Sequence, residues 1–162
     1  MHTIVFQNGT ILHIEDIALE ELFHYTQRGI NSREAGGVLI GKKLSSKDEY
    51  IICGLTTPNV YDKRDYLSFT RSVKLHQSYI NKRWKETNGI ENYVGEWHTH
   101  PEVMPTPSTI DRDLIKQVVR DHTGVFGKIF LIIVGQKRTM YIGCAEIING
   151  GEICAYVKRV FE

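Results

Sequence analysis

Apolar residues along this chain form short runs with strand character, separated by stretches in which they recur at helical spacing. The run from 128 to 134 is almost continuously apolar, as expected for a central strand covered on both faces. The preceding segment, 109–122, has apolar residues three and four positions apart, which predicts a helix. The residues expected to face inward from this helix are Ile110, Leu114, Ile115, Val118 and Val119.

The same patterns predict the remaining elements. Asn8-Gly9 accepts the positive φ angles of a tight turn, so a hairpin is expected between 3–6 and 10–14. Two further helices are expected, at 16–28 and at 72–87. The second has an apolar stripe made of Val73, His76, Ile80 and Trp84, on which His76 is interpreted as a packed core histidine. The other predicted strands are 38–40, paired with 50–55, then 93–97, and a closing hairpin of 140–148 and 152–161 around Asn149-Gly150.

Length and composition favour one globular domain. The chain has 162 residues, 41% of them hydrophobic and 24% charged, which is enough for a proper core. A formal net charge of +1 gives no reason to expect nucleic acid or an anionic membrane as a partner. The longest apolar run is too short to span a bilayer, and the first residues lack the features of a signal peptide. Cys53, Cys144 and Cys154 are odd in number and widely spaced, which favours reduced thiols in a cytoplasmic protein.

The residues with metal-binding chemistry are concentrated where the strand 93–97 ends. His98 and His100 are two apart, so on a strand they project to the same face. Ser108 stands where the next helix begins, three residues before Asp111 and therefore on the same side of its first turn. Two imidazoles and one carboxylate can thus converge on a single ion. Three ligands of N and O type with an open fourth position make a catalytic zinc site.

Each half of this pattern also has an ordinary structural explanation. Paired histidines on a strand are more often surface residues than ligands. Ser-x-x-Asp before an apolar helix resembles a capping box, in which Ser108 caps the helix and Asp111 favours its N-terminus. The combination at this spacing is much more specific than either half, and a third segment distinguishes the two explanations.

That segment is 34–41, in which the carboxylate of Glu34 directly precedes a small-residue, apolar strand. The order E-x-x-G-x-L-x-G, then H-x-H, seven intervening residues and S-x-x-D matches the JAMM signature. The chain therefore resembles the JAMM/MPN metalloproteases over nearly its whole length. GEWHTHPE followed by PS-x-x-D is similar to bacterial JAMM proteins encoded beside ubiquitin-like conjugation enzymes in CBASS anti-phage systems. The resemblance implies an α/β fold, with residues 1–162 as a single JAMM/MPN-like catalytic domain whose mixed, curved β-sheet is flanked by about three helices.

The resemblance also implies a role for each motif residue. His98, His100 and Asp111 bind Zn²⁺. Glu34 is the general base and then the proton donor to the leaving amine. Ser108 donates a hydrogen bond to the oxyanion that develops on the scissile carbonyl.

One position departs from the eukaryotic members of this family. Their tryptophan often lies two residues before the first ligand, whereas here Glu96 is in that place and Trp97 follows it. By strand parity Glu96 shares the face of the two histidines. Two explanations stay open: Glu96 orients a ligand imidazole, or it is solvated at the rim of the site.

For the substrate, the resemblance implies a protein with an extended C-terminal tail. This is a ubiquitin-like protein or a tail-conjugated cyclic-nucleotide synthase, cut at the amide bond after the tail. Such a deubiquitinase-like enzyme would reverse the work of an E1/E2-like conjugation system in anti-phage defence. Three alternatives stay open, namely hydrolysis at the C-terminus of a sulfur-carrier protein, a non-catalytic MPN scaffold and a metal phosphodiesterase. The scaffold is disfavoured because all five motif positions are present, and the phosphodiesterase because the composition does not suggest a basic cleft.

Residues 56–71 are the least regular part of the sequence. In JAMM enzymes an insertion near this place helps to hold the substrate tail. We therefore expect 68–71 to offer backbone edges, and Phe69 or Arg71 a side chain, to such a tail by β-augmentation. A surface loop that ends in a short strand is the alternative.

Overall fold

The computed structural model describes residues 1–44, 47–122, 126–148, 151 and 153–161. Its helices are α1 (Asp16–His24), α2 (Val73–Glu86) and α3 (Thr109–His122). Its strands are β1 (His2–Val5), β2 (Ile11–Ile14), β3 (Gly36–Lys43), β4 (Glu49–Leu55), β5 (Lys63–Arg64), β6 (Phe69–Thr70), β7 (Asn92–Thr99), β8 (Lys128–Val134), β9 (Thr139–Ile147) and β10 (Ile153–Phe161).

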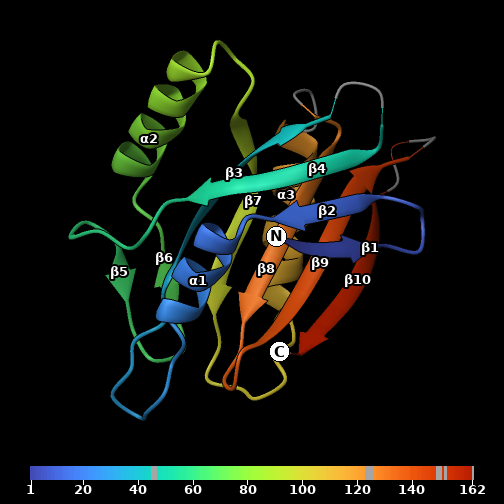
Figure 1. Cartoon of the computed structure of the whole chain (residues 1–162). Helices are drawn as coiled ribbons and strands as arrows, with labels where there is room; N and C mark the ends of the chain where they lie inside the picture. Colours follow the sequence, from blue (N-terminus) through green and yellow to red (C-terminus); the bar gives the residue numbers. More distant parts are fainter. Residues whose placement is uncertain (45–46, 123–125, 149–150, 152, 162) are drawn as a thin grey trace.

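Eight of the strands form one curved sheet in the order β1-β2-β4-β3-β7-β8-β9-β10, and β5 pairs with β6 beside it (Figure 1). The pairs β2–β4 and β7–β8 are parallel, and the other neighbouring pairs are antiparallel. A mixed sheet with three helices confirms the predicted α/β fold class. β7 lies between β3 and β8 near the middle of the sheet, so the strand that carries both histidines is braced on its two sides.

Different helices cover the two faces of the sheet. On one face, Leu22 of α1 belongs to a core cluster that contains Trp97 of β7 and Phe130 of β8. Ile129, the neighbour of Phe130, points to the opposite face and packs with Val119 of α3. The side chains of β7 that alternate with Trp97 therefore point towards the layer that holds α3.

A β-bulge in β7 changes which residues share this second face. Leu39 pairs with Gly95 and Ile40 with Tyr93, so Val94 is the extra residue of the bulge. A bulge of this kind shifts the alternation of side chains by one position. Tyr93 and Glu96, three residues apart, consequently point to the same face and their side chains are hydrogen-bonded.

Most predicted elements are confirmed, and the differences concern how much of each helix is covered. The first helix ends at His24 instead of residue 28, and Tyr25 follows as its C-cap. In α2 only His76 and Ile80 are buried, because the helix projects from the body of the molecule and contacts β3 and β7 along one side (Figure 1). The expected inward stripe is therefore wrong for Val73 and Trp84, which are exposed.

Some predicted details are settled by single residues. Gly9 has a φ of 86°, as the predicted first hairpin requires. The closing hairpin is present as β9 and β10, whereas its predicted turn at 149–150 lies outside the described residues. The three cysteines are free, and burial raises the pKa of the Cys53 and Cys144 thiols to about 12. None of the described helices has the length and apolar character needed to cross a membrane.

Candidate metal centre

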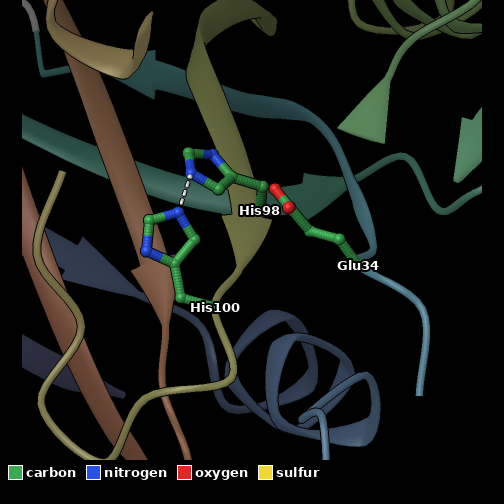
Figure 2. Close-up of side chains that lie close together, drawn as sticks. All are labelled: Glu34, His98 and His100. Carbon is green, nitrogen blue, oxygen red and sulfur yellow. Dashed lines mark hydrogen bonds between the residues drawn. The ribbon is translucent and has the colours of Figure 1, made fainter. Parts of the chain in front are cut away.

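The two histidines of the motif lie at the C-terminal end of β7 and face the same space. Nε2 of His98 is 3.1 Å from Nε2 of His100 (Figure 2). Thr99 points the other way, where its hydroxyl accepts a hydrogen bond from the Ala35 N–H and donates one to Gln27. The alternation expected for a strand is thus confirmed, and the buried contacts of Thr99 fix the direction of the imidazoles on either side of it.

Asp111, from the first turn of α3, closes a triangle with these imidazoles. One of its carboxylate oxygens lies 3.2 Å from Nε2 of His98, and the other lies 3.5 Å from Nε2 of His100. A tetrahedral zinc ion with bonds of about 2.0–2.1 Å places its ligand atoms about 3.3 Å apart. The distance between the two nitrogens, and that from each nitrogen to its nearer carboxylate oxygen, are close to this value, so the three side chains lie near enough together to approach one ion. A donor set of two nitrogens and one oxygen suits zinc.

Ser108 and Asp111 also form the capping box that was the ordinary explanation of their spacing. The Ser108 N–H donates to the Asp111 carboxylate at 2.7 Å, and the Asp111 N–H donates to the Ser108 hydroxyl oxygen at 3.2 Å. The two explanations are compatible, because the cap holds the Asp111 carboxylate where it meets the histidines. The hydroxyl hydrogen of Ser108 is left to donate elsewhere.

Glu34 faces the imidazoles of His98 and His100 from a different segment of the chain, the one before β3. Its carboxylate and the ring nitrogens of His98 and His100 can be taken as a group whose ligand atoms all lie within 4.8 Å of one another. Figure 2 shows the carboxylate reaching from the segment before β3 towards the two imidazoles of β7. The residue is 6% exposed. The structure thus brings Glu34, His98, His100 and Asp111 together, and it places Ser108 in hydrogen-bond contact with Asp111.

Burial raises the pKa of the Glu34 carboxyl to about 7, while His100 lowers it and Asp111 raises it further. A carboxyl with a pKa near neutrality can both take and give a proton. For Asp111 the balance is the opposite. Burial by itself would raise its pKa, but the hydrogen bonds with His100 and His98 outweigh burial and hold the pKa well below its usual range. One acid therefore suits proton transfer, and the other stays a charged carboxylate, the state in which a carboxyl group can bind a metal ion.

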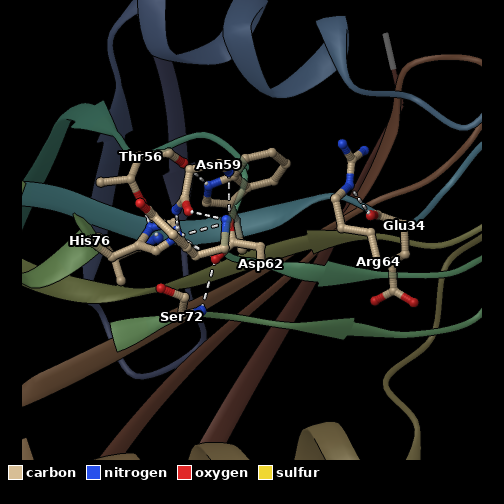
Figure 3. A network of polar contacts seen from close by, with 10 residues as sticks. Glu34, Thr56, Asn59, Asp62, Arg64, Ser72 and His76 are labelled. Carbon is tan, nitrogen blue, oxygen red and sulfur yellow. Dashed lines mark hydrogen bonds and ion pairs between the residues drawn. The ribbon is translucent and has the colours of Figure 1, made fainter. Parts of the chain in front are cut away.

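The backbone of Glu34 is held by the segment that contains β5. The Glu34 N–H donates to the Asp65 carbonyl at 2.6 Å, and Nε of Arg64 donates to the Glu34 carbonyl at 2.8 Å. Figure 3 shows the Arg64 side chain reaching across to Glu34. Sequence reasoning missed Arg64 and Asp65, because contacts between residues about 30 positions apart in an irregular stretch leave no periodic signal.

The irregular segment itself is fastened by a buried polar network (Figure 3). The Asp62 carboxylate accepts hydrogen bonds from the backbone N–H groups of Asn59 and Ser72 and lies 3.1 Å from Nε2 of His76. Nδ1 of His76 is hydrogen-bonded to the Thr56 hydroxyl at the end of β4. His76 is therefore a buried core histidine, as expected, and it ties α2 and the loop to the sheet.

The candidate metal centre lies in a groove between β6 and α3. Two adjoining cavities of about 340 and 290 Å³ are lined in common by Glu34, Phe69, Thr70, Ile110 and Asp111. The prediction that Ile110 and Leu114 face inward is wrong, because they are 79% and 43% exposed and line this groove instead. The apolar stripe of α3 is thus shared between the core, which takes Val118 and Val119, and the groove.

Gly36 lets the groove wall approach the sheet. A Cβ atom there would lie 2.6 Å from the Phe69 ring and 2.7 Å from the Trp97 carbonyl oxygen. Any larger residue would displace either Phe69 or β7. Gly36 falls on a variable position of the E-x-x-G-x-L-x-G motif, yet this position has its own steric reason to be small.

Glu96 fits neither of its two predicted explanations. It is 7% exposed, so it is not solvated at the rim, and its carboxylate has no hydrogen bond to an imidazole among the described residues. Arg71 donates to it at 2.9 Å and the Tyr93 hydroxyl at 2.8 Å. Burial raises the pKa of Glu96, and the charge and hydrogen bonds of Arg71 together with Tyr93 oppose that rise.

Comparison with known proteins agrees with this geometry. The family model described as prokaryotic homologs of the JAB domain matches residues 17–144, which include every residue of the site. The chain belongs to this JAB family. The JAMM/MPN resemblance read from the motif is thereby confirmed.

Among its relatives, this JAB protein is similar to several called CD-NTase/cGAS isopeptidase. One from Pseudomonas aeruginosa is 36% identical over 105 residues, which is 65% of each chain. One from Vibrio cholerae is 34% identical over 117 residues, covering 72% of this chain and 70% of the relative. One from Escherichia coli is 35% identical over 132 residues, covering 82% and 80%. The match thus spans slightly less than two thirds of the Pseudomonas protein and more of the other two.

Proposed function

We propose that this JAB-family chain is a zinc-dependent isopeptidase. It hydrolyses the amide bond after the C-terminal tail of a ubiquitin-like protein or of a tail-conjugated cyclic-nucleotide synthase. The observation that carries the proposal is the convergence of His98, His100 and Asp111, each imidazole within 3.5 Å of the Asp111 carboxylate, with Glu34 facing the same imidazoles in an open groove. The relatives named isopeptidases support the same class of reaction.

His98, His100 and Asp111 would hold the ion. When bound, zinc supplies a Lewis acid that acidifies water and polarises a carbonyl group. The low pKa of the Asp111 carboxyl keeps this ligand charged, and its two hydrogen bonds with the helix cap keep it oriented. The three side chains also leave one side of the site facing the groove, where a peptide carbonyl can enter.

Glu34 moves the proton. Its carboxylate takes a proton from the attacking water, and the resulting carboxylic acid gives that proton to the nitrogen of the leaving amine as the C–N bond breaks. Water thus contributes its oxygen to the new carboxyl group and its hydrogen to the amine. A buried carboxyl whose pKa is near 7 suits both steps.

Ser108 stabilises the charge that develops on the carbonyl oxygen. Its hydroxyl oxygen already accepts the Asp111 N–H, so its hydrogen is available to the substrate. A hydrogen bond aimed at the developing oxyanion is worth about 3 kcal/mol of transition-state stabilisation in comparable enzymes.

The tail would lie between β6 and α3. Ser68, Phe69 and Thr70 line the groove on one side, and Ile110 lines it on the other. Extended tails bind such a short strand by backbone hydrogen bonds, while alternate side chains enter pockets. Arg71, which was expected to offer its side chain to the tail, is paired with Glu96.

The names of the relatives support a CD-NTase as the conjugated protein. We further propose that the reaction reverses modification by an E1/E2-like system during anti-phage defence. We place this reaction in the cytoplasm, for which the three free thiols are suited. Residues 1–162 would act as one catalytic domain. A sulfur-carrier C-terminus is the alternative substrate that fits the same chemistry, and a non-catalytic scaffold would not need an acid in the place of Glu34.

The test uses purified, zinc-loaded protein and four substrates: a ubiquitin-like tail fused to a peptide, a CD-NTase with its tail fused likewise, a sulfur carrier with a C-terminal extension, and a nucleotide phosphodiester. Mass spectrometry reports which bond is cut. The proposal predicts cleavage of one of the first two directly after the tail. Cleavage of the sulfur-carrier fusion alone would favour the alternative, and hydrolysis of the phosphodiester alone would contradict peptidase function.

A further inference from the structure

The groove at the metal centre borders a further cavity along β7. This cavity, of about 180 Å³, is lined by Tyr93 and Asn92 of β7, Val118 of α3 and residues of α2. The lining residues of α3 advance by one turn at a time. Ile110 and Leu114 line the cavity of about 290 Å³ at the metal centre, and Val118 lines the one beyond it. The two cavities therefore follow one another along the same strand and the same helix.

Two residues line both cavities, namely Arg71 and Glu96. Nη2 of Arg71 donates to Oε1 of Glu96 at 2.9 Å, and the Tyr93 hydroxyl donates to the same oxygen at 2.8 Å. The side chains of Arg71 and Glu96 are 27% and 9% exposed. The two cavities are thus separated by the ion pair between Arg71, which follows β6, and Glu96 of β7.

We infer that the Arg71–Glu96 ion pair is the end wall of the substrate groove and sets the size of the substrate side chain accepted beside the metal centre. A side chain that points along β7 from the scissile bond meets this pair before it can reach the second cavity. Small residues fit in front of the wall, and large ones would have to break an ion pair that lies mostly out of water. The inference rests on the proposed function, because it concerns the substrate of the same site.

The chemistry of the wall explains why it should exclude by size and not attract by charge. The guanidinium and the carboxylate neutralise each other, so the wall presents no net charge to the substrate. Breaking the pair to admit a large side chain would leave a mostly buried carboxylate without its counterion, which is costly. Replacing Arg71 by a smaller residue, in contrast, opens the wall without moving any backbone.

The test measures specificity with the holoenzyme. Tail fusions carry Ala, Leu or Phe at each of the three positions on either side of the scissile bond, and the ratio of kcat/KM for Phe to that for Ala is determined at each position. The variant Arg71→Ala/Glu96→Gln removes the guanidinium, leaves no unpaired charge and keeps an acceptor for Tyr93. We expect its Phe/Ala ratio to rise at least tenfold over the wild type at one position and to stay unchanged at the others.

A matched control is the double variant Arg83→Ala/Glu91→Gln. Arg83 and Glu91 form the same kind of ion pair outside the groove, so this variant should keep the wild-type ratios at all positions. If the first double variant fails to fold, Arg71→Ser/Glu96→Gln, which also leaves no unpaired charge and keeps an acceptor for Tyr93, must show the same directional change.

The outcomes separate the inference from the function beneath it. Cleavage by wild type and variant with the same Phe/Ala ratio at every position would overturn the end wall while the isopeptidase stands. An equal loss of kcat for all substrates, with no change in any ratio, would show that the pair is merely structural and would overturn it too. No cleavage of any fusion by the zinc-loaded wild type would contradict the proposed function and the inference together.

Discussion

Arg64 holds the backbone of Glu34: its Nε donates to the Glu34 carbonyl oxygen at 2.8 Å, while the Glu34 N–H is bound by the Asp65 carbonyl at 2.6 Å. The proposed proton-transfer residue is thus fixed through its main chain by the segment that also leads into the groove wall at Phe69. The same segment therefore fixes both the position of Glu34 and that of Phe69, which lines the groove.

Replacing Arg64 by alanine should weaken catalysis without removing the metal. A small displacement of a reacting group can cost about 100-fold in rate, so we expect kcat to fall between about 10- and 100-fold. Zinc content, measured by inductively coupled plasma mass spectrometry, should remain that of the wild type because none of the three proposed ligands is changed. Lys63→Ala, on the exposed neighbour in β5, is the control and should leave kcat unchanged; an unaltered kcat in Arg64→Ala would contradict this role.

Asp111→Asn should separate metal binding from helix capping. The amide oxygen of asparagine can still accept the Ser108 N–H, so the helical content of the metal-free protein, measured by circular dichroism, should change little. Loss of the ligand charge should lower the affinity for zinc by at least 10-fold, as measured by competition with a chromogenic chelator. Asp113→Asn on the exposed side of the same helix is the control. Wild-type zinc affinity in Asp111→Asn would remove Asp111 from the ligand set.

Ser108→Ala should give a slow enzyme that still holds zinc. Loss of one oxyanion donor lowers kcat by about 100- to 1,000-fold in comparable enzymes. KM should change much less than kcat, because the hydrogen bond is strongest in the transition state. The alanine variant also loses the cap to the Asp111 N–H, at a cost of about 1 kcal/mol in stability. Ser108→Thr keeps the hydroxyl and should recover part of kcat. A rise in KM with an unchanged kcat in Ser108→Ala would argue against the oxyanion role.

Asp62 should contribute to stability in a manner that depends on pH. Burial by itself would raise its pKa, but hydrogen bonds from the backbone of Asn59 and Ser72, and the contact with His76, outweigh burial and hold the pKa below its usual value. The unfolded chain therefore binds a proton at a higher pH than the native one does. This contribution is fully present above pH about 4, the ordinary pKa of aspartate, and is lost as the pH falls through the lower native value.

Asp62→Asn should accordingly lower the free energy of unfolding by about 2 kcal/mol at pH 7, because three hydrogen bonds to a buried carboxylate are weakened. Urea unfolding should show the difference from the wild type constant above pH about 4, the ordinary pKa of aspartate, and shrinking as the pH falls below it. Asp65→Asn is the control, because the Asp65 side chain is exposed and, within the described part of the chain, accepts a hydrogen bond from the N–H of its neighbour Tyr66. A difference that stays constant as the pH falls below the ordinary pKa would contradict the assignment.

Part of the candidate site could be predicted from the sequence because it follows local rules. His98 and His100 share a face through strand alternation, and Ser108 and Asp111 share the first turn of a helix. The place of Glu34 came from the family motif, since nothing local brings residue 34 next to residue 98. Their meeting depends on the pairing of Gly36 with His98 across β3 and β7.

What the sequence did not predict depends on long-range geometry. The bulge at Val94 brings Tyr93 beside Glu96, and without it strand parity would put them on opposite faces. Ile110 and Leu114 have the spacing of core residues, yet they are exposed and line the groove. Apolar periodicity shows which side of a helix is apolar, but not whether that side packs against the core or lines a groove.

The most direct test of the account is a zinc titration of chelator-stripped protein, with cleavage of the tail fusion followed in parallel for the wild type and Glu34→Gln. The account predicts that both proteins bind one zinc per chain with similar affinity. Wild-type activity should rise in proportion to zinc and reach its plateau at one equivalent, whereas Glu34→Gln should stay at least 1,000-fold slower throughout. Full activity in the stripped wild type, or wild-type turnover by zinc-loaded Glu34→Gln, would contradict it.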